Sequence, residues 1–278
     1  RPKFHVYKPT IGVISGIAWD HINVFPTFEN YLEQFQIFAN LIPDDGVLIY
    51  CKEDIYCKQI AENSTGKHKI PYTLPEFILK KGQYIIVDEG EKYTLQVFGQ
   101  HNLLNIEAAH SVCNRLGISN YSFYSAIQSF KGASKRLEVV YDDHEKTLYK
   151  DFAHAPSKLK ASIAAVKEKF PNRQLVACVE LHTFSSLTAE FLKQYAHSMD
   201  KADLPIVYFN PHAIALKKLP LLSEDIVFNA FANPKLQVFQ NAQTLFDFLK
   251  SLDWQNKNLL MMSSGNFDGM KFEHFFNS

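Results

Sequence analysis

The chain has 278 residues, enough for two ordinary domains, and its apolar content of 46% is typical of soluble globular proteins. Its 29 basic and 29 acidic residues give a formal net charge of zero, so charge gives no reason to expect nucleic-acid or membrane-surface binding. No apolar run approaches the roughly 18 residues that cross a bilayer, which argues against membrane insertion.

The first part of the chain alternates between strand and helix patterns. Residues 11–15 form a β-branched apolar run that predicts a buried strand. Because this run reads like an internal strand and no initiator Met precedes it, we expect a piece of a longer protein. Apolar side chains then recur at helical spacing from Phe28 to Leu41, after Pro26 or Thr27 as the helix start. With a further strand at 46–50, this order predicts a parallel crossover unit.

An antiparallel hairpin is expected next. The apolar runs 84–87 and 93–97 flank the turn Asp88-Glu89-Gly90, a pattern typical of a hairpin. Helices are expected near residues 54–62, 102–116 and 121–129.

The segment Phe130-Lys131-Gly132 breaks the pattern, and a second series of strands and helices follows. Strands that alternate with helices of this length predict a second α/β layer, so we place a domain boundary near residue 132. The expected strands are 137–141, 147–151, 174–179, 205–209 and 258–262, and the expected helices are 156–169, 187–198 and 242–251.

Polar residues follow two of these strands, where open parallel sheets bind ligands. Asp20 and His21 follow the first strand, and a carboxylate beside an imidazole can hold a divalent metal, although turn formation is the commoner reason for such a pair. Asp151 and His154 follow the strand 147–151, where Asp151 can accept hydrogen bonds from ribose hydroxyls. Capping by Asp151 and a surface histidine are the alternatives.

Two further segments combine polar side chains with glycine. Asn102 and Asn105 share a helix face after Gly99, and their amides suit a purine edge, although His101 or Asn102 as an ordinary helix cap explains the same pattern. Lys135 and Arg136 follow Gly132, and arginine suits phosphate, although a solvated basic pair is equally consistent.

Two strand-end loops complete the candidates for a polar substrate site. Their hydroxyls, amides and glycine suit a polar ligand, but plain turns would look the same. The first loop contains Glu180, His182, Thr183 and Ser185, and the second contains Ser264, Gly265 and Asn266. The sequence has no GxxxxGK[ST] phosphate-binding loop and no nucleophile elbow.

Each pattern is weak alone, but their order resembles the Mur ligase family of ATP-dependent peptidoglycan ligases. The matching motifs span almost the whole chain: Asp20-His21 after the opening strand, Gly99-x-His-Asn-x-x-Asn-x-x-Ala-Ala109, Phe130-x-Gly-x-x-Lys-Arg-x-Glu138 and Asp151-Phe-Ala-His-x-Pro156. The resemblance implies an α/β fold in which residues 1–132 are the later part of the central ATP-binding domain, without its phosphate-binding loop. Residues 133–278 would then be the Rossmann-like C-terminal domain.

The resemblance also implies a role for each candidate. His21 would be a magnesium ligand beside Asp20, and His101, Asn102 and Asn105 would lie at the adenine. Arg136 would reach the nucleotide or its phosphates, Asp151 would bind ribose, and His154 would line the active site, with Arg136 and His154 as the catalytic pair. The incoming acceptor would be received by His182, Thr183, Ser185, Ser264, Gly265 and Asn266.

The implied reaction is amide ligation through an acyl phosphate, with ATP and Mg²⁺. The segment Asp20–Phe25, with Phe35, is most similar to the murein peptide branch of the family. That branch works in the cytoplasm in peptidoglycan recycling and joins UDP-N-acetylmuramate to the murein tripeptide L-Ala-γ-D-Glu-meso-diaminopimelate. Four cysteines without a CxxC pair agree with such a reducing compartment.

Three alternatives to the murein peptide branch stay open. They are the branch that adds L-alanine, a folate-type polyglutamate ligase, and a non-catalytic binding module if the natural chain is this short. Two residues depart from the family pattern: Ala155 stands where a second histidine is common, and Lys135 where arginine is common.

Overall fold

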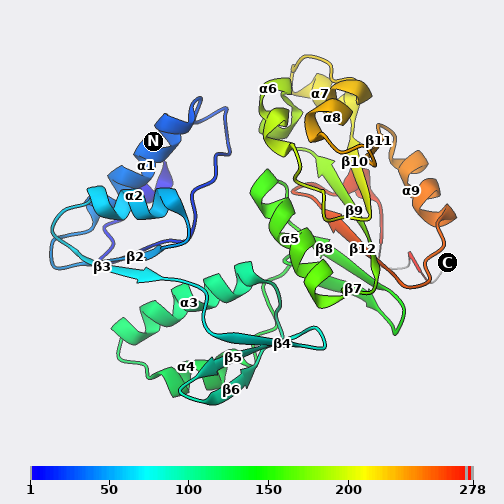
Figure 1. Cartoon of the computed structure of the whole chain (residues 1–278). Helices are drawn as coiled ribbons and strands as arrows, with labels where there is room; N and C mark the ends of the chain where they lie inside the picture. The colour runs from blue at the N-terminus through cyan, green and yellow to red at the C-terminus, as the bar shows by residue number, and fades with distance from the viewer. Residues whose placement is uncertain (1, 273–274, 277–278) are drawn as a thin grey trace. The chain divides into compact units, whose positions relative to one another are not determined.

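The computed structural model describes residues 2–272, 275 and 276. The chain divides into two compact units, Arg1–Lys131 and Gly132–Ser278 (Figure 1). Gly132 begins the second unit with φ at 94°, a left-handed conformation that glycine adopts without steric cost.

The first unit contains a three-stranded parallel sheet in the order β1-β2-β3. Its strands are β1 (Ile11–Ile14), β2 (Val47–Cys51) and β3 (His68–Tyr72). The pairing of β1 with β2 confirms the predicted parallel crossover. Sequence reasoning missed β3, because a lysine and a proline interrupt its apolar pattern.

Both faces of this sheet are covered by helices. Helices α1 (Phe28–Leu41) and α2 (Ile55–Asn63) lie on one face, and α3 (Gln100–Arg115) lies on the other (Figure 1). Leu48 points to the first face, while Val47 and Ile49 point to the second. The two-sided burial of β2 explains its continuous apolar sequence. A short 3₁₀ helix, η1 (Lys3–Val6), precedes β1.

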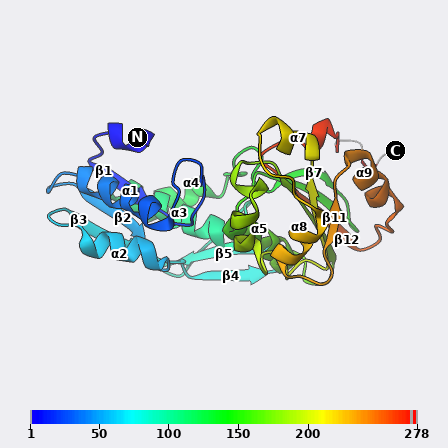
Figure 2. The ribbon, with the colours of Figure 1, turned by 90° about the horizontal axis from the view of Figure 1, so that it is seen from above.

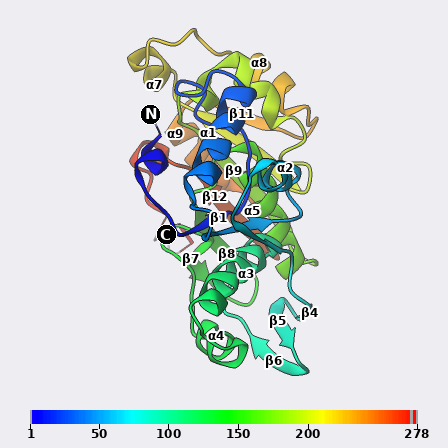
Figure 3. The same ribbon diagram turned by 90° about the vertical axis from the view of Figure 1, so that its left-hand side faces the viewer.

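A second, antiparallel sheet completes the first unit. Its strands are β4 (Phe77–Lys80), β5 (Gln83–Asp88) and β6 (Glu91–Thr94), and α4 (Asn120–Ile127) lies beside it (Figure 3). The pairing of β5 with β6 confirms the predicted hairpin. The rings of Tyr93 on β6 and Tyr124 on α4 lie 5.3 Å apart and hold the helix against the sheet.

The second unit is built on a six-stranded sheet in the order β11-β10-β9-β12-β8-β7. All neighbouring strands pair in parallel except β7 with β8. This arrangement confirms the expected α/β fold. The strands are β7 (Glu138–Asp142), β8 (Thr147–Asp151), β9 (Gln174–Leu181), β10 (Leu204–Phe209), β11 (Gln237–Phe239) and β12 (Lys257–Met262).

Helices flank this sheet on both sides (Figures 1 and 2). Helix α5 (Pro156–Lys169) lies on one side, and α9 (Ala242–Ser251) packs Leu245 and Leu249 against the core on the other. The remaining elements are η2 (Ser185–Leu187), α6 (Ala189–Leu192), η3 (Lys193–Tyr195), α7 (Pro211–Leu216), α8 (Glu224–Phe231) and η4 (Phe267–Gly269). None of the helices in the described ranges has the length and apolar character needed to cross a bilayer.

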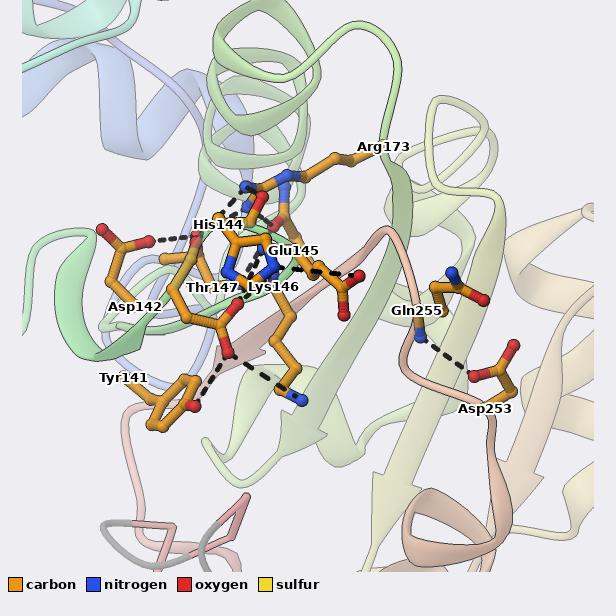
Figure 4. A network of polar contacts seen from close by, with 11 residues as sticks. Tyr141, Asp142, His144, Glu145, Lys146, Thr147, Arg173, Asp253 and Gln255 are labelled. Atoms are coloured by element: carbon orange, nitrogen blue, oxygen red, sulfur yellow. Dashed lines mark hydrogen bonds and ion pairs between the residues drawn. The ribbon is translucent and has the colours of Figure 1, made fainter.

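A polar network lies at the amino-terminal ends of the parallel strands of the second sheet (Figure 4). Arg173, just before β9, donates from Nη1 to Thr147 Oγ1 and to Asn258 Oδ1, both at 3.0 Å. Its Nη2 donates to the carbonyl oxygen of His144 at 2.7 Å. One guanidinium therefore ties β8, β12 and the β7–β8 turn together at the edge opposite to the strand ends that carry the candidate site.

The predicted helix 187–198 is wrong in extent, because the structure breaks this segment into η2, α6 and η3. Thr188 Oγ1 donates to the carbonyl oxygen of Ser185 at 2.8 Å, a local bond that competes with helical pairing. At the other end of the segment, His197 has φ at 59°, which a helix does not allow. Sequence reasoning also missed α7, α8 and β11, which are too short to show a clear period.

Candidate functional site

The loop after β1 carries the predicted metal-binding pair. Asp20 is 7% exposed, and its Oδ1 accepts a hydrogen bond from the His21 backbone N–H at 2.7 Å. His21 Nε2 lies 3.9 Å from Asp20 Oδ2, and the His21 side chain is 64% exposed. Its φ of 57° places His21 in the left-handed region. The turn therefore holds the carboxylate inside and presents the imidazole to solvent.

Asp54 anchors this loop from the end of β2. Its Oδ2 accepts from the Ile17 N–H at 3.0 Å, and its Oδ1 accepts from the N–H groups of Tyr56 and Cys57 at the start of α2. One carboxylate therefore caps a helix and fixes the loop that contains His21. Sequence reasoning missed this residue, although an aspartate at the start of a predicted helix is a capping signal.

The Asp20–His21 pair fits a metal that is held partly by substrate. Magnesium usually keeps waters and phosphate oxygens among its ligands, so one or two protein groups suffice. Among residues 2–272, 275 and 276, no group of three or more His, Cys, Asp or Glu side chains is arranged to hold a metal ion.

The start of α3 carries the residues that were predicted to contact adenine. The alternative prediction was that His101 or Asn102 caps this helix. Gly99 is the N-cap, with φ at 89° and no side-chain capping bond, so the assignment of His101 or Asn102 as the cap is wrong. Asn102 Nδ2 instead donates to the Phe98 carbonyl oxygen at 2.8 Å. Asn105 lies about one turn further on and is exposed. The two amides lie on one helix, at the spacing expected for a shared face.

In the second unit, the structure brings Arg136 close to the segment that carries Asp151 and His154. The Arg136 guanidinium lies 5.1 Å from the centre of the Phe152 ring, and the Phe152 and His154 rings meet edge to face at 5.2 Å. Phe152 N–H also donates to the Lys135 carbonyl oxygen at 2.8 Å. The two predicted catalytic residues are thus connected through one aromatic ring.

Asp151 ends β8 and is 6% exposed. Its Oδ1 accepts from the Ala153 N–H at 3.2 Å, and its Oδ2 accepts a short hydrogen bond from the Ser162 hydroxyl of α5. Each carboxylate oxygen has two lone pairs, so both oxygens keep the capacity to accept a further bond from a ligand. Ser162 was not predicted, because its link to Asp151 depends on how α5 packs on the sheet.

His154 is held in one orientation from two sides. Its Nδ1 lies 2.8 Å from the Phe152 carbonyl oxygen, and its own carbonyl oxygen accepts from the Tyr195 hydroxyl at 2.5 Å. A carbonyl oxygen can only accept, so the proton of the neutral ring sits on Nδ1. Nε2 is then the acceptor atom of an imidazole that is only 7% exposed.

The two predicted acceptor loops meet at Glu180, the residue before the last of β9. Glu180 is 3% exposed, and its Oε2 accepts from the Phe267 N–H at 2.8 Å and from the Ser263 hydroxyl. Its Oε1 lies 3.7 Å from His182 Nδ1. An added Cβ on Gly265 would lie 2.8 Å from both Glu180 Oε2 and His182 Cγ, so only glycine fits there.

The other predicted acceptor residues differ in their surroundings. Thr183 Oγ1 accepts from the Ser186 N–H at 3.1 Å, and Ser185 is buried, so both residues shape the turn before α6. The Ser264 hydroxyl oxygen is buried and has no hydrogen-bond partner among the residues that the structure describes, whereas Asn266 is exposed. Of this set, His182 and Gly265 are in direct proximity.

A pocket of about 160 Å³ lies at the carboxyl-terminal edge of the second sheet. Three predicted residues line it, namely Asp151, Gly265 and Asn266. Lys135 and Lys150 give the lining two basic residues against the one acidic residue Asp151, a balance that favours an anionic ligand. The other lining residues are Met261, Ser263, Phe267, Met270 and Phe272.

A larger pocket of about 580 Å³, which sequence reasoning missed, lies at the ends of β10 and β11. Asn210, Asn241 and Asp268 are among its lining residues. Burial, together with the hydrogen bond that its hydroxyl donates to Asp268 Oδ2 at 2.5 Å, raises the pKa of Tyr208. Tyr208 therefore stays a neutral donor that holds the Asp268 carboxylate in place.

Comparison with known proteins identifies the family. Residues 3–113 match the family model of the Mur ligase middle domain. A UDP-N-acetylmuramate–L-alanine ligase from Caldicellulosiruptor bescii is 31% identical over 73% of this chain and 47% of its own length. The corresponding enzyme from Caldanaerobacter subterraneus subsp. tengcongensis is 27% identical over 95% of this chain and 60% of its own length.

Solved structures show the same fold. A murein peptide ligase from Psychrobacter arcticus covers 100% of this chain and 59% of its own, with a TM-score of 0.66 and 19% identity. The UDP-N-acetylmuramate–alanine ligase MurC from Thermotoga maritima covers 95% of this chain and 58% of its own, with a TM-score of 0.67 and 17% identity. The chain spans only about half to three fifths of the length of the curated relatives that it matches.

Proposed function

This chain belongs to the Mur ligase family, and on that basis we propose that its protein is an ATP-dependent ligase of peptidoglycan biosynthesis. The observation that carries this proposal is the position of the family's motif residues in the second unit. Arg136, Asp151 and His154 gather around Phe152 at the end of β8, where a parallel sheet receives its ligand. The substrates are ATP, UDP-N-acetylmuramate and an acceptor with a free amine.

L-alanine is the acceptor that we favour. The curated relatives described above are named as UDP-N-acetylmuramate–L-alanine ligases. The segment Asp20–Phe25 favoured the murein tripeptide. Among the proteins described above, a murein peptide ligase matches at 19% identity, and that similarity concerns the fold alone. The tripeptide is therefore the competing acceptor in the test.

The chemistry proceeds in two steps. A carboxylate oxygen of UDP-N-acetylmuramate attacks the γ-phosphorus of ATP, which breaks the bond to ADP and forms an acyl phosphate. The acceptor amine then attacks the acyl carbon, loses a proton and releases inorganic phosphate. Several negative charges meet in the first step, so positioning and cationic groups supply most of the catalysis.

Each candidate residue has a role in this scheme. Asn102 and Asn105 would contact the adenine, with His101 beside them, and Asp151 would accept hydrogen bonds from ribose hydroxyls. Arg136, oriented by Phe152, would bind phosphate oxygens, and His154 would offer Nε2 as a hydrogen-bond or proton acceptor. A magnesium ion next to His21 would offset phosphate charge when bound.

Acceptor competition in the full-length gene product tests the proposal. With ATP and UDP-N-acetylmuramate present, ADP release should depend on L-alanine and should be slower with the murein tripeptide. ADP release that requires the tripeptide would move the protein to the murein peptide branch, and no release with either acceptor would overturn the proposal. The 278-residue chain alone is the control and should not turn over, because its sequence contains no phosphate-binding loop.

A further inference from the structure

The geometry at the end of β9 points to a further residue of the acceptor site. We propose that Glu180 is a positioning residue, which fixes the loop Ser263–Phe267 against His182 so that this loop can receive the acceptor. The kinetic consequence rests on the proposed ligase function, whereas the structural part of the inference does not.

The first argument is that Glu180 connects two strand ends that are distant in sequence. β9 and β12 are neighbours in the sheet, and their exit loops leave the same edge. Ser263 Oγ donates to Glu180 Oε2 and itself accepts from the Gly265 N–H at 2.6 Å. The Phe267 N–H reaches the same Oε2 at 2.8 Å. One oxygen atom therefore determines the position of both ends of the loop.

The second argument is that the loop has a backbone conformation that needs external support. Phe267 and Asp268 are consecutive non-glycine residues in the left-handed region, with φ at 50° and 52°. Such conformations persist only where the surroundings over-determine them, and they cluster at functional sites. Glu180 supplies that support at Phe267, while Tyr208 and Asn210 donate to the Asp268 carboxylate.

The third argument concerns the cost of the charge. Glu180 is 3% exposed and follows a run of buried apolar residues in β9. Burying a carboxylate costs free energy, and a well-packed apolar side chain at such a position would stabilise the fold as well or better. The carboxylate is explained by the loop that it holds. In this loop, a Cβ added to Gly265 would lie within 3 Å of both Glu180 and His182.

Two variants separate the hydrogen bonds of Glu180 from its volume. Glu180→Gln keeps one amide oxygen that can accept from both Ser263 and Phe267, so it should preserve the loop. Glu180→Met keeps the volume but accepts no hydrogen bond, so it should release the loop while the strand stays packed. Asp203→Leu is the matched control, because Asp203 Oδ2 also accepts two bonds, from Leu175 N–H at 2.7 Å and Lys167 Nζ at 2.8 Å. Leu175 lies at the opposite end of β9.

The kinetic test uses the full-length gene product with ATP, UDP-N-acetylmuramate and L-alanine. Glu180→Met should raise the acceptor KM at least tenfold and leave the KM for ATP within twofold. Glu180→Gln should stay within threefold of the natural protein for both substrates, and Asp203→Leu should change neither KM. An unchanged acceptor KM in Glu180→Met, or an equal rise in the KM of ATP, would overturn the inference.

Hydrogen exchange of the 278-residue chain gives a readout that does not depend on activity. The backbone amides of Gly265 and Phe267 should exchange at least tenfold faster in Glu180→Met, and not in Glu180→Gln or Asp203→Leu. Unchanged exchange would refute the inference even if the ligase function holds. If exchange at these amides is faster in Glu180→Met but the full-length gene product has no ligase activity, Glu180 remains a positioning residue. The proposed ligase function is then the claim that fails.

Discussion

At the scale of single residues, the candidate site depends on buried carboxylates whose oxygens are partly used by the protein itself. Asp151 illustrates this arrangement, because Ala153 and Ser162 fix its side chain before any ligand arrives. A carboxylate that is already held in place would not have to reorient for a ribose hydroxyl, so its hydrogen bonds to that hydroxyl would contribute more fully to binding.

Replacement of Asp151 should weaken nucleotide binding selectively. Hydrogen bonds to a charged acceptor contribute about 1.5–3 kcal/mol, so we expect Asp151→Ala in the full-length protein to raise the ADP Kd by about 10- to 100-fold. Isothermal titration calorimetry measures this change. Asp253→Ala, a carboxylate at the opposite edge of the sheet, is the control and should leave the Kd unchanged. An ADP Kd within twofold of the natural value in Asp151→Ala would remove Asp151 from the nucleotide site.

A second residue-scale prediction concerns acid stability at the β7–β8 turn (Figure 4). Partial desolvation acts to raise the pKa of Asp143, but the N–H groups of Glu145 and Lys146, the Tyr141 hydroxyl and the Lys146 cation outweigh it and lower the pKa to about 2. An unfolded aspartate has a pKa of about 3.9, so the unfolded state binds the proton first as the pH falls. The stabilisation from Asp143 is present above the pKa of the unfolded aspartate and is lost progressively as the pH falls from about 5 towards 2.

Urea unfolding between pH 2 and pH 5 tests the role of Asp143. The natural chain should lose stability as the pH falls through this range, and Asp143→Asn should lose less of it. Tyr141→Phe removes one donor and should give an intermediate slope. An identical pH dependence in all three chains would contradict the assignment.

The sequence singled out the candidate residues, but it did not reveal the contacts that hold their side chains and loops in place. Asp151, His154 and Arg136 follow strand ends or a glycine junction, and such positions are visible in a linear pattern. Ser162 and Glu180 reach their partners through contacts that span 11 and 87 positions of the chain. Such contacts exist only after helices and strands have packed, so no local pattern contains them.

At the scale of helices and strands, length and two-sided burial determined what could be predicted. Helices α5 and α9 and strand β8 were predicted at the bounds that the structure gives, because each has a clear period or apolar run between turn residues. Strand β11 has three residues and helix α6 has four, and tertiary contacts decide whether such short segments become regular.

Helix α2 and the His21 loop should depend on one side chain. Asp54 accepts three backbone N–H bonds, from Ile17, Tyr56 and Cys57, whereas Thr27 at the start of α1 accepts one, from Asn30. Loss of a cap costs about 0.5–2 kcal/mol, so we expect Asp54→Ala to lie at the upper end of this range and Thr27→Ala at the lower end.

Urea denaturation of the two capping variants measures the difference in the free energy of unfolding. Hydrogen exchange at the Ile17 amide should also increase in Asp54→Ala and stay unchanged in Thr27→Ala. Equal destabilisation by the two variants would show that the link between Asp54 and the loop adds nothing to the cap.

At the scale of the whole chain, the second unit has a sheet and flanking helices of its own. All six strands of its sheet and the helices on both sides lie after Gly132. We therefore expect residues 132–278, expressed alone, to fold and to unfold in one cooperative urea transition. Circular dichroism and urea titration check this result, and a non-cooperative transition would show that this unit needs the rest of the chain.

The central claim is that the protein joins a carboxylate to an amine through an acyl phosphate, and oxygen transfer tests it most directly. UDP-N-acetylmuramate labelled with ¹⁸O in its lactyl carboxylate is incubated with the full-length gene product, ATP and L-alanine, and the released phosphate is analysed by mass spectrometry. Because the carboxylate oxygen that attacks ATP leaves with the phosphate, the account predicts one ¹⁸O atom in each phosphate released with amide formation. Phosphate without ¹⁸O in a reaction that still forms the amide would contradict it.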